Sequence, residues 1–111
     1  MRNLLYVFAL FFVLTVLFSS NSTSSAMSAR EIDANCDVVL FTTQSCGYCK
    51  QAKNMLAKTE VAWCEKDIEN SKENLANFKS LGGRGVPVMV AGDKILKGYN
   101  EQIYKKAIAE L

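Results

Sequence analysis

The sequence predicts an α/β domain built on a mixed four-stranded sheet, with the element order β-α-β-α-β-β-α. Two apolar stretches of β-forming residues flank a segment of helix formers, which predicts a parallel strand pair joined by a right-handed crossover. Near the end of the chain, a tight turn at residues 91–94 separates two further apolar stretches and predicts an antiparallel hairpin. The chain of 111 residues is long enough for one ordinary domain.

Each element has its own signal. The continuous apolar run Val38–Phe41 suits a strand that is covered on both faces. Apolar residues recur at helical spacing in three other segments, and Gly82-Gly83 ends the second of these. We therefore expect strands at residues 38–41, 61–64, 86–90 and 95–96, and helices at residues 48–58, 71–81 and 101–111.

The first 26 residues have the layout of a secretory signal peptide. Arg2 is followed by the apolar run 4–18 and then by a stretch rich in Ser, Thr and Asn. The apolar run is shorter than the roughly 20 residues that a membrane-spanning helix needs. Cleavage after Ala26 fits the small-residue rule better than cleavage after Ala29. The alternative is a retained anchor, with membrane attachment through residues 4–18.

These features divide the chain into a signal peptide at 1–26, a linker at 27–36 and a folded domain at 37–111. The domain is expected to be exported, either periplasmic or secreted, or else anchored with the domain outside the cytoplasm. In either case it meets an oxidising compartment, in which disulfides persist.

Composition excludes several function classes. The sequence contains no His, which excludes imidazole acid–base chemistry and metal sites that need imidazole. The formal net charge is +2, and the part after the signal segment is nearly charge-balanced. The sequence contains no block of like charge, so nothing in it indicates a nucleic-acid partner.

Cys46 and Cys49 lie two residues apart, after the first strand and at the start of the first helix. A thiol at a helix N-terminus faces unpaired N–H groups and the positive end of the helix dipole, and both favour the thiolate. This position predicts that Cys46 is a nucleophile. Cys49, one turn inside the helix, is expected to be buried and to act as the resolving thiol.

Two other interpretations of this pair are weaker. A zinc site needs four ligands, and Cys36 and Cys64 are the only further cysteines in the sequence. A purely structural disulfide across two residues would constrain the unfolded chain little. We therefore favour a reversible redox couple and expect neither a metal ion nor a bound cofactor.

A second signal is Val86-Pro87, at the start of an apolar strand. Proline cannot donate to a β-ladder, so its place here is explained either by an edge strand or by a cis peptide bond. A cis bond would turn the Val86 backbone outward, where its N–H and C=O can pair with an extended substrate.

The element order, "SCGYC" at a strand–helix junction, "RGVP", and "KGY" before the last helix together resemble the glutaredoxin family. The resemblance covers about residues 37–111. It implies a thioredoxin-like, glutaredoxin-type fold with a four-stranded mixed sheet flanked by three helices. It also implies a monomeric thiol–disulfide oxidoreductase that acts on protein disulfides or glutathione mixed disulfides.

By position, the resemblance makes Cys46 the attacking thiol, Cys49 the resolving thiol, Pro87 the cis proline and Val86 the backbone clamp for glutathione. The redox-active disulfide would be Cys46–Cys49. The substrate or glutathione groove that the resemblance implies consists of Thr43, Tyr48, Arg84, Val86, Pro87, Gly98, Tyr99 and Asn100.

The sequence departs from the family pattern at several groove positions. Gly47 replaces the proline between the cysteines, and Thr43 replaces a lysine. Asn100 and Glu101 stand where the family has a serine or aspartate pair for the γ-glutamyl end. These departures weaken the expected hold on glutathione unless Arg84 compensates. The electron donor is therefore open between glutathione and a protein thiol of the thioredoxin-reductase type.

Two alternative functions come from the same resemblance. Some glutaredoxins that lack the inter-cysteine proline hold a [2Fe-2S] cluster between two subunits with glutathione. A thioredoxin-fold binding module without activity is the other alternative.

Cys36 and Cys64 raise a separate question. Cys36 lies just before the first strand and Cys64 in the second, and these strands should be parallel neighbours. Their Cα atoms could fall within the roughly 7 Å limit for a disulfide. A bridge, two buried free thiols and a regulatory pair all remain open from the sequence.

Overall fold

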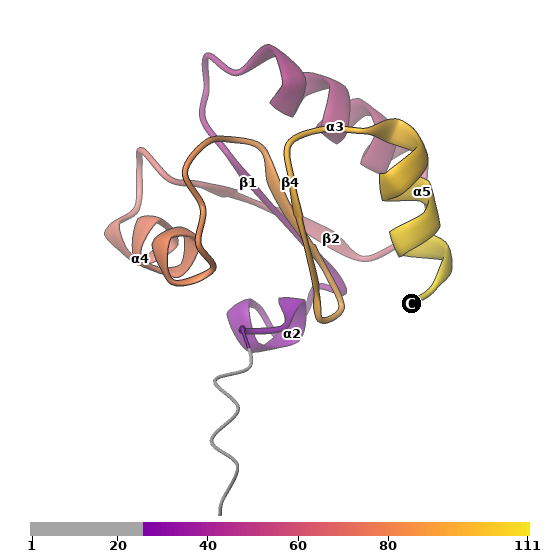
Figure 1. Cartoon of the computed structure of the whole chain (residues 1–111), viewed down its shortest axis with the longest axis horizontal. Helices are drawn as coiled ribbons and strands as arrows, with labels where there is room; N and C mark the ends of the chain where they lie inside the picture. Colours follow the sequence, from indigo (N-terminus) through magenta and orange to yellow (C-terminus); the bar gives the residue numbers. More distant parts are fainter. Residues whose placement is uncertain (1–25) are drawn as a thin grey trace, which may run out of the picture.

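The centre of the protein is a four-stranded mixed sheet with the strand order β2-β1-β3-β4 (Figure 1). In the computed structural model, which describes residues 26–111, β1 pairs with β2 in parallel and with β3 antiparallel, and β3 and β4 form the hairpin. The strands are β1 Val38–Thr42, β2 Trp63–Asp67, β3 Val88–Ala91 and β4 Lys94–Lys97.

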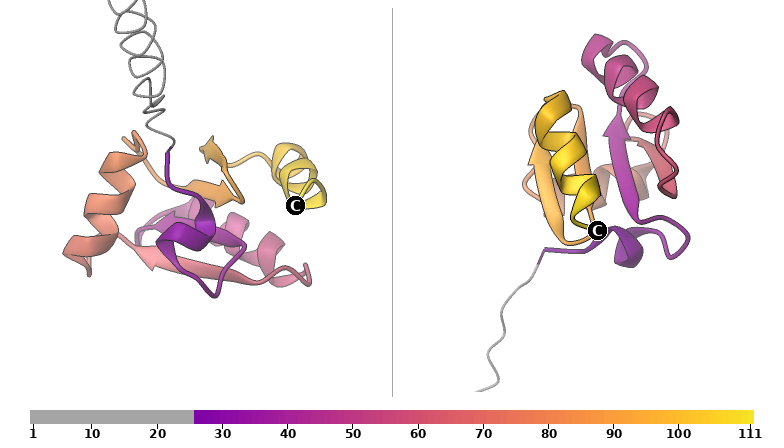
Figure 2. Two further views of the ribbon diagram at one scale, coloured as in Figure 1. Left: turned by 90° about the horizontal axis from the view of Figure 1, so that it is seen from below. Right: turned by 90° about the vertical axis from the view of Figure 1, so that its right-hand side faces the viewer.

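Helices cover both faces of this sheet, as Figures 1 and 2 show. Side chains of α3 and α5 share one core cluster with Leu40 and Met89, and side chains of α2 and α4 share the other with Phe41 and Val88. The helices are α2 Ala29–Ile32, α3 Gly47–Ala57, α4 Lys72–Ser80 and α5 Glu101–Ala109. From β1 onward, the order β-α-β-α-β-β-α is the one that the sequence predicts.

The second strand lies later in the chain than predicted. We expected it at 61–64, but β2 pairs with β1 from Trp63 opposite Val38 to Asp67 opposite Thr42. The apolar stretch misplaced the strand because β2 is an edge strand, where charged side chains such as Glu65 can face water.

The segment that we expected to be a linker, residues 27–36, packs on the sheet instead. Ser28 and Glu31 form a capping box that starts α2, and the Ala29 side chain is fully buried. The Ala29 N–H donates a hydrogen bond of 2.7 Å to the Gly92 carbonyl in the β3–β4 turn. This helix is too short to be stable alone, so its tertiary contacts determine it.

The predictions for the signal peptide and for the anchor at 4–18 concern residues 1–25, which lie outside the described residues. Among residues 26–111, no helix is long and apolar enough to cross a membrane.

Thr42 gives the first testable prediction. Its side chain is buried, and within residues 26–111 its hydroxyl has no hydrogen-bond partner. A buried hydroxyl without a partner loses its hydrogen bonds to water and gains no other hydrogen bond, which destabilises the folded state. Thr42→Val should therefore raise the unfolding free energy by about 1 kcal/mol and the melting temperature by roughly 4–8 °C. Thermal unfolding by circular dichroism measures this. A lower melting temperature in the variant would show that a bound water or other partner satisfies the hydroxyl.

Gly83 gives the second prediction. A Cβ at this position would lie 2.4 Å from a ring carbon of Phe78, whose ring packs on Phe41 at a centroid distance of 5.9 Å. Gly83→Ala should cost roughly 1–3 kcal/mol, because the core must shift to admit the methyl group. Gly85→Ala is the matched control, since a Cβ there would meet nothing within 4 Å. Urea unfolding of the two variants should differ; equal midpoints would contradict the packing described for Phe78.

Candidate active site

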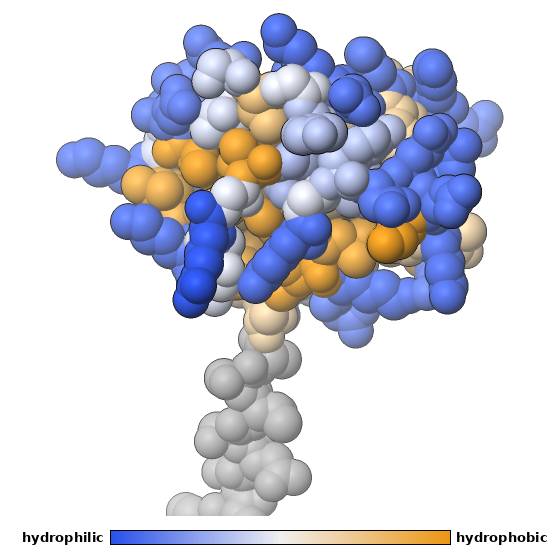
Figure 3. Space-filling model, turned by 45° about the horizontal axis from the view of Figure 1, so that its top comes forward, coloured by the Kyte–Doolittle hydropathy of each residue, from blue (hydrophilic) through white to orange (hydrophobic). Residues whose placement is uncertain are grey.

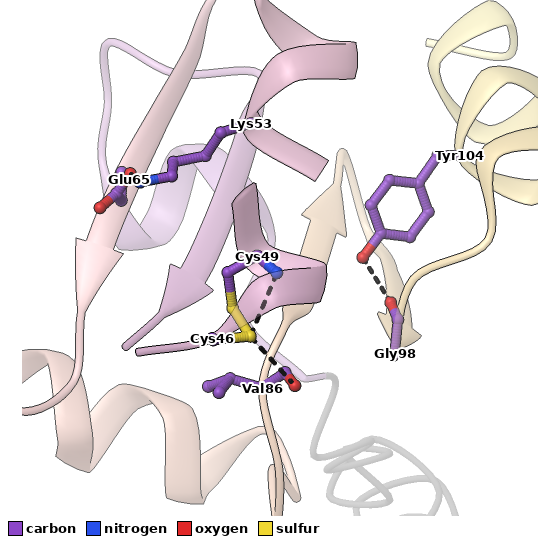
Figure 4. The surroundings of a disulfide bond; sticks show 7 residues. All are labelled: Cys46, Cys49, Lys53, Glu65, Val86, Gly98 and Tyr104. Atoms are coloured by element: carbon purple, nitrogen blue, oxygen red, sulfur yellow. Dashed lines mark hydrogen bonds and ion pairs between the residues drawn. A yellow bond between two sulfur atoms is a disulfide. The ribbon is translucent and has the colours of Figure 1, made fainter. Parts of the chain in front are cut away.

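Cys46 and Cys49 lie at the junction between the loop after β1 and the start of α3 (Figure 4). Cys46 is the N-cap of α3, and its sulfur accepts a hydrogen bond of 3.1 Å from the Cys49 N–H. Cys46 and Cys49 form a disulfide with their Cα atoms 5.2 Å apart. The Cys49 side chain is fully buried, whereas Cys46 is partly exposed. The predicted positions of both thiols are confirmed.

This geometry makes the two sulfurs chemically unequal. The Cys46 sulfur faces a backbone donor and the positive end of the α3 dipole, and both stabilise a negative charge on it. The Cys49 sulfur is shielded from solvent behind it. The arrangement thus offers one sulfur that an outside disulfide can reach and a second sulfur that can displace whatever is bound to the first.

The Val86–Pro87 peptide lies next to this pair. The bond is cis, as the sequence predicts. The Cys46 sulfur lies 3.8 Å from the Val86 carbonyl oxygen, as Figure 4 shows. Because β3 begins only at Val88, the missing N–H of Pro87 costs the sheet no ladder hydrogen bond. Val86 is half-buried, so part of it remains in contact with solvent beside the reactive sulfur.

A cavity of about 360 Å³ extends from Val86. Three residues of the predicted groove line it, namely Arg84, Val86 and Gly98. The structure adds Lys97 to them, a residue that we did not predict. Two cationic side chains therefore border a cavity that shares Val86 with the surroundings of the Cys46 sulfur, although neither cysteine lines it. The only sequence signal for Lys97 is its place in "KGY", directly before Gly98.

Tyr99 and Asn100 do not line this cavity. Tyr99 packs edge-on against Tyr104, with ring centroids 5.3 Å apart. The Asn100 side chain caps α5 by accepting the Ile103 N–H at 3.1 Å. The Tyr104 hydroxyl donates to the Gly98 carbonyl. These contacts fix the turn that presents Gly98; a direct binding role for Tyr99 and Asn100 stays a prediction.

The buried Tyr104 remains protonated as this donor, because burial raises the pKa of its hydroxyl well above the usual value.

A larger cavity of about 500 Å³ lies between α3 and α5, and neither cysteine lines it. Tyr99 and Glu101 are among its lining residues, together with Lys58 and Lys105.

The other two predicted groove residues, Thr43 and Tyr48, are close to the disulfide in the sequence. Thr43 is half-buried in the loop after β1, and Tyr48, between the cysteines, is 64% exposed. An exposed aromatic side chain beside a reactive sulfur offers apolar contact area to a docking polypeptide. Figure 3 brings the top of the Figure 1 view forward and shows an apolar area among hydrophilic residues.

Comparisons with known proteins identify the family and the fold. The glutaredoxin family model matches residues 38–96. The crystal structure of a glutaredoxin from Archaeoglobus fulgidus is 26% identical, with a TM-score of 0.61 over 69% of this chain and 90% of that one. Among curated proteins, none matches the sequence significantly.

Two more distant structures share the fold. The glutaredoxin-like NrdH-redoxin of Escherichia coli is 19% identical, with a TM-score of 0.57 over 62% of this chain and 91% of that one. The buckwheat glutaredoxin, solved with glutathione, is 20% identical, with a TM-score of 0.57 over 71% of this chain and 77% of that one. The fold is thus thioredoxin-like. Together with the paired cysteines, the family match shows that this chain belongs to the glutaredoxin family.

Proposed function

We propose that this protein is a dithiol thiol–disulfide oxidoreductase that acts on protein disulfides or glutathione mixed disulfides through Cys46 and Cys49. The observation that carries the proposal is the inequality of the two sulfurs. Cys46 is partly exposed and accepts the Cys49 N–H at 3.1 Å, while Cys49 is fully buried. A crosslink with a merely structural role would not need one sulfur to be reachable and activated.

The reaction has two exchange steps. The Cys46 thiolate attacks one sulfur of a substrate disulfide, a Cys46–substrate disulfide forms, and the other substrate sulfur leaves as a thiolate. Cys49 then loses its proton and attacks the Cys46 sulfur, which releases the second substrate thiolate and closes the Cys46–Cys49 disulfide. The structure contains this oxidised form. Two thiols of an electron donor reopen it by the reverse exchange.

The Val86 backbone would position the substrate for the first step. The Val86 carbonyl lies 3.8 Å from the Cys46 sulfur, and Val86 precedes the paired part of β3. An extended substrate segment can add to such an unpaired edge through main-chain hydrogen bonds, which are independent of its sequence. This mode of binding suits a variety of disulfide partners.

The charges around the groove bear on the electron donor. Arg84 and Lys97 supply positive charge at one cavity wall. Thr43, in the loop after β1, carries no positive charge, and Glu101 adds a negative charge at the start of α5. We propose that glutathione is held mainly by the Val86 backbone and by the cavity wall that carries Arg84. We also propose that a protein thiol reduces the Cys46–Cys49 disulfide faster than glutathione does.

A side-by-side assay tests this function. The same disulfide substrate is offered with glutathione plus glutathione reductase, and with thioredoxin plus thioredoxin reductase. We expect turnover with both and at least a roughly tenfold faster rate with the protein donor, because each absent charge-assisted hydrogen bond costs about 1.5–3 kcal/mol. The Cys46→Ser/Cys49→Ser double variant is the blank. No turnover above this blank with either donor would overturn the proposal.

We also propose that residues 1–26 direct export and are removed after Ala26. Support comes from the fold that follows. Cleavage there leaves the Ser28–Glu31 capping box intact, whereas cleavage after Ala29 would remove both the cap and a fully buried side chain. The mass of the exported protein should match a chain that begins at Met27; a mass that includes residues 4–18 would show a retained anchor.

A further inference from the structure

A second pair of thiols lies at the end of β1 opposite the active site. Cys36 precedes β1 and is buried, and Cys64 lies half-buried in β2. Both are free thiols in the structure. Their sulfurs and a carboxylate oxygen of Asp33 all lie within 4.8 Å of one another. Neither cysteine has a part in the exchange reaction described above.

Backbone contacts hold the two thiols side by side. The N–H groups of Asp37 and Val38 both donate to the Ala62 carbonyl, at 2.8 and 3.1 Å. One residue further along, Val39 faces Cys64 in the parallel register of β1 and β2. The segments that carry the two sulfurs are therefore fixed next to each other by main-chain hydrogen bonds, with the sulfurs within 4.8 Å of each other.

The same surroundings disfavour a metal ion. The Asp33 carboxylate is already occupied, because its Oδ2 forms an ion pair of 2.8 Å with the Lys66 ammonium. That leaves the two sulfurs as donors, whereas a structural zinc site takes four. Lys66 also places a positive charge where a cation would have to bind. The cluster is thus better suited to a sulfur–sulfur bond than to coordination.

We propose that Cys36 and Cys64 form a second, structural disulfide that stays closed while Cys46–Cys49 turns over. The oxidant is another disulfide, either a protein disulfide or a small-molecule one such as oxidised glutathione. One thiolate of the pair attacks it, forms a mixed disulfide and releases a thiolate; the other then displaces the second thiolate. Two protein thiols lose two electrons and two protons, and the disulfide becomes two thiols.

Three features keep this bond closed under conditions that open the active-site bond. Cys36 is buried, so an attacking thiolate cannot reach its sulfur. Neither cysteine caps a helix N-terminus, in contrast to Cys46. Burial and the neighbouring Cys36 and Asp33 raise the pKa of the Cys64 thiol, so the reduced pair lacks the thiolate stabilisation that makes an active-site disulfide easy to reduce.

The crosslink would tie together parts of the fold that are distant in the sequence. It closes the loop between residues 36 and 64, which contains β1, α3 and both active-site cysteines. It also fixes the α2 segment to β2 next to the Asp33–Lys66 ion pair. A closed loop of this length restricts the unfolded chain and so favours the folded state.

The test uses the full chain with Cys46→Ser and Cys49→Ser, so that only this pair can form an intramolecular disulfide. After incubation with oxidised glutathione, free thiols are alkylated and the protein is digested without reduction. Mass spectrometry should find a Cys36–Cys64 crosslinked peptide and no alkylated cysteine. Reduction should lower the melting temperature by roughly 10–20 °C. The control, in which Cys36 and Cys64 are also changed to Ala, should show no shift on reduction.

Alkylation of both cysteines after the oxidant, a separate glutathione adduct on each, or one bound zinc per chain would each overturn the proposal. In the wild-type chain, a titration with dithiothreitol should open Cys46–Cys49 well before Cys36–Cys64; the reverse order would contradict the structural role. The crosslink itself is independent of the proposed function, and only its persistence during turnover of Cys46–Cys49 rests on that function. Absence of exchange activity with an intact crosslink would therefore count against that function alone.

Discussion

Replacing Cys46 with Ser should reduce disulfide exchange to the uncatalysed background, whereas replacing Cys49 should leave part of the activity and trap a mixed disulfide on Cys46. Cys46 is the sulfur that solvent reaches and that the Cys49 N–H stabilises. Without it, the buried Cys49 sulfur cannot reach an outside disulfide. Without Cys49, attack still occurs but the internal displacement that releases the substrate is lost.

Intact-protein mass spectrometry after incubation with oxidised glutathione checks this pair of variants. Cys49→Ser should gain one glutathione adduct that maps to Cys46, and Cys46→Ser should gain none at Cys49. Ser45→Ala, an exposed neighbour outside the exchange chemistry, serves as the control and should behave like the wild type. Full activity in Cys46→Ser would show that the assigned roles are wrong.

The second large effect concerns charge in the groove. Thr43→Lys should raise the glutathione-coupled rate about tenfold, because it restores a cation that the family pattern places three residues before the first cysteine. Arg84→Gln and Lys97→Gln should each lower that rate by a similar factor, since both side chains line the cavity beside Val86. The protein-donor rate should change less, because the proposed main-chain contacts at Val86 do not involve these charges.

Glutathione saturation curves for these variants make the measurement, with Lys106→Gln on the exposed side of α5 as the charge-matched control. The effect should lie in the Michaelis constant for glutathione and diminish at high salt, as expected for exposed charges. A Thr43→Lys variant with an unchanged Michaelis constant would mean that the loop after β1 does not contact glutathione.

Much of the fold and of the thiol chemistry could be predicted from the sequence. The apolar run at 38–41 is buried on both sides, so its composition alone indicates a central strand. Cys46 lies between the apolar run of the first strand and the helix formers that follow, so the sequence alone places it just before a helix. The position of Pro87 at the start of an apolar strand leaves an edge strand and a cis bond open, and the family resemblance favours the cis bond that the structure has.

Other parts depend on tertiary contacts that leave little trace in the sequence. α2 forms because the Ala29 side chain is buried and its N–H donates a hydrogen bond to the Gly92 carbonyl. Residues 27–36, which look like a linker in the sequence, therefore contain a helix. β2 extends to Asp67 because pairing with β1, rather than hydrophobicity, determines an edge strand. Lys97 joins the cavity only through the β3–β4 hairpin register, and charged residues in a short hairpin show no pattern that indicates such a role.

We propose Cys46 as the activated sulfur and Cys49 as the buried, resolving one. The most direct measurement is the rate at which each thiol of the reduced wild-type protein reacts with limiting iodoacetamide at neutral pH, followed peptide by peptide by mass spectrometry. The structure predicts that Cys46 is modified well before Cys49, because only Cys46 combines exposure with the Cys49 N–H and the helix N-terminus. Modification of Cys49 first, or of both at the same rate, would contradict the account.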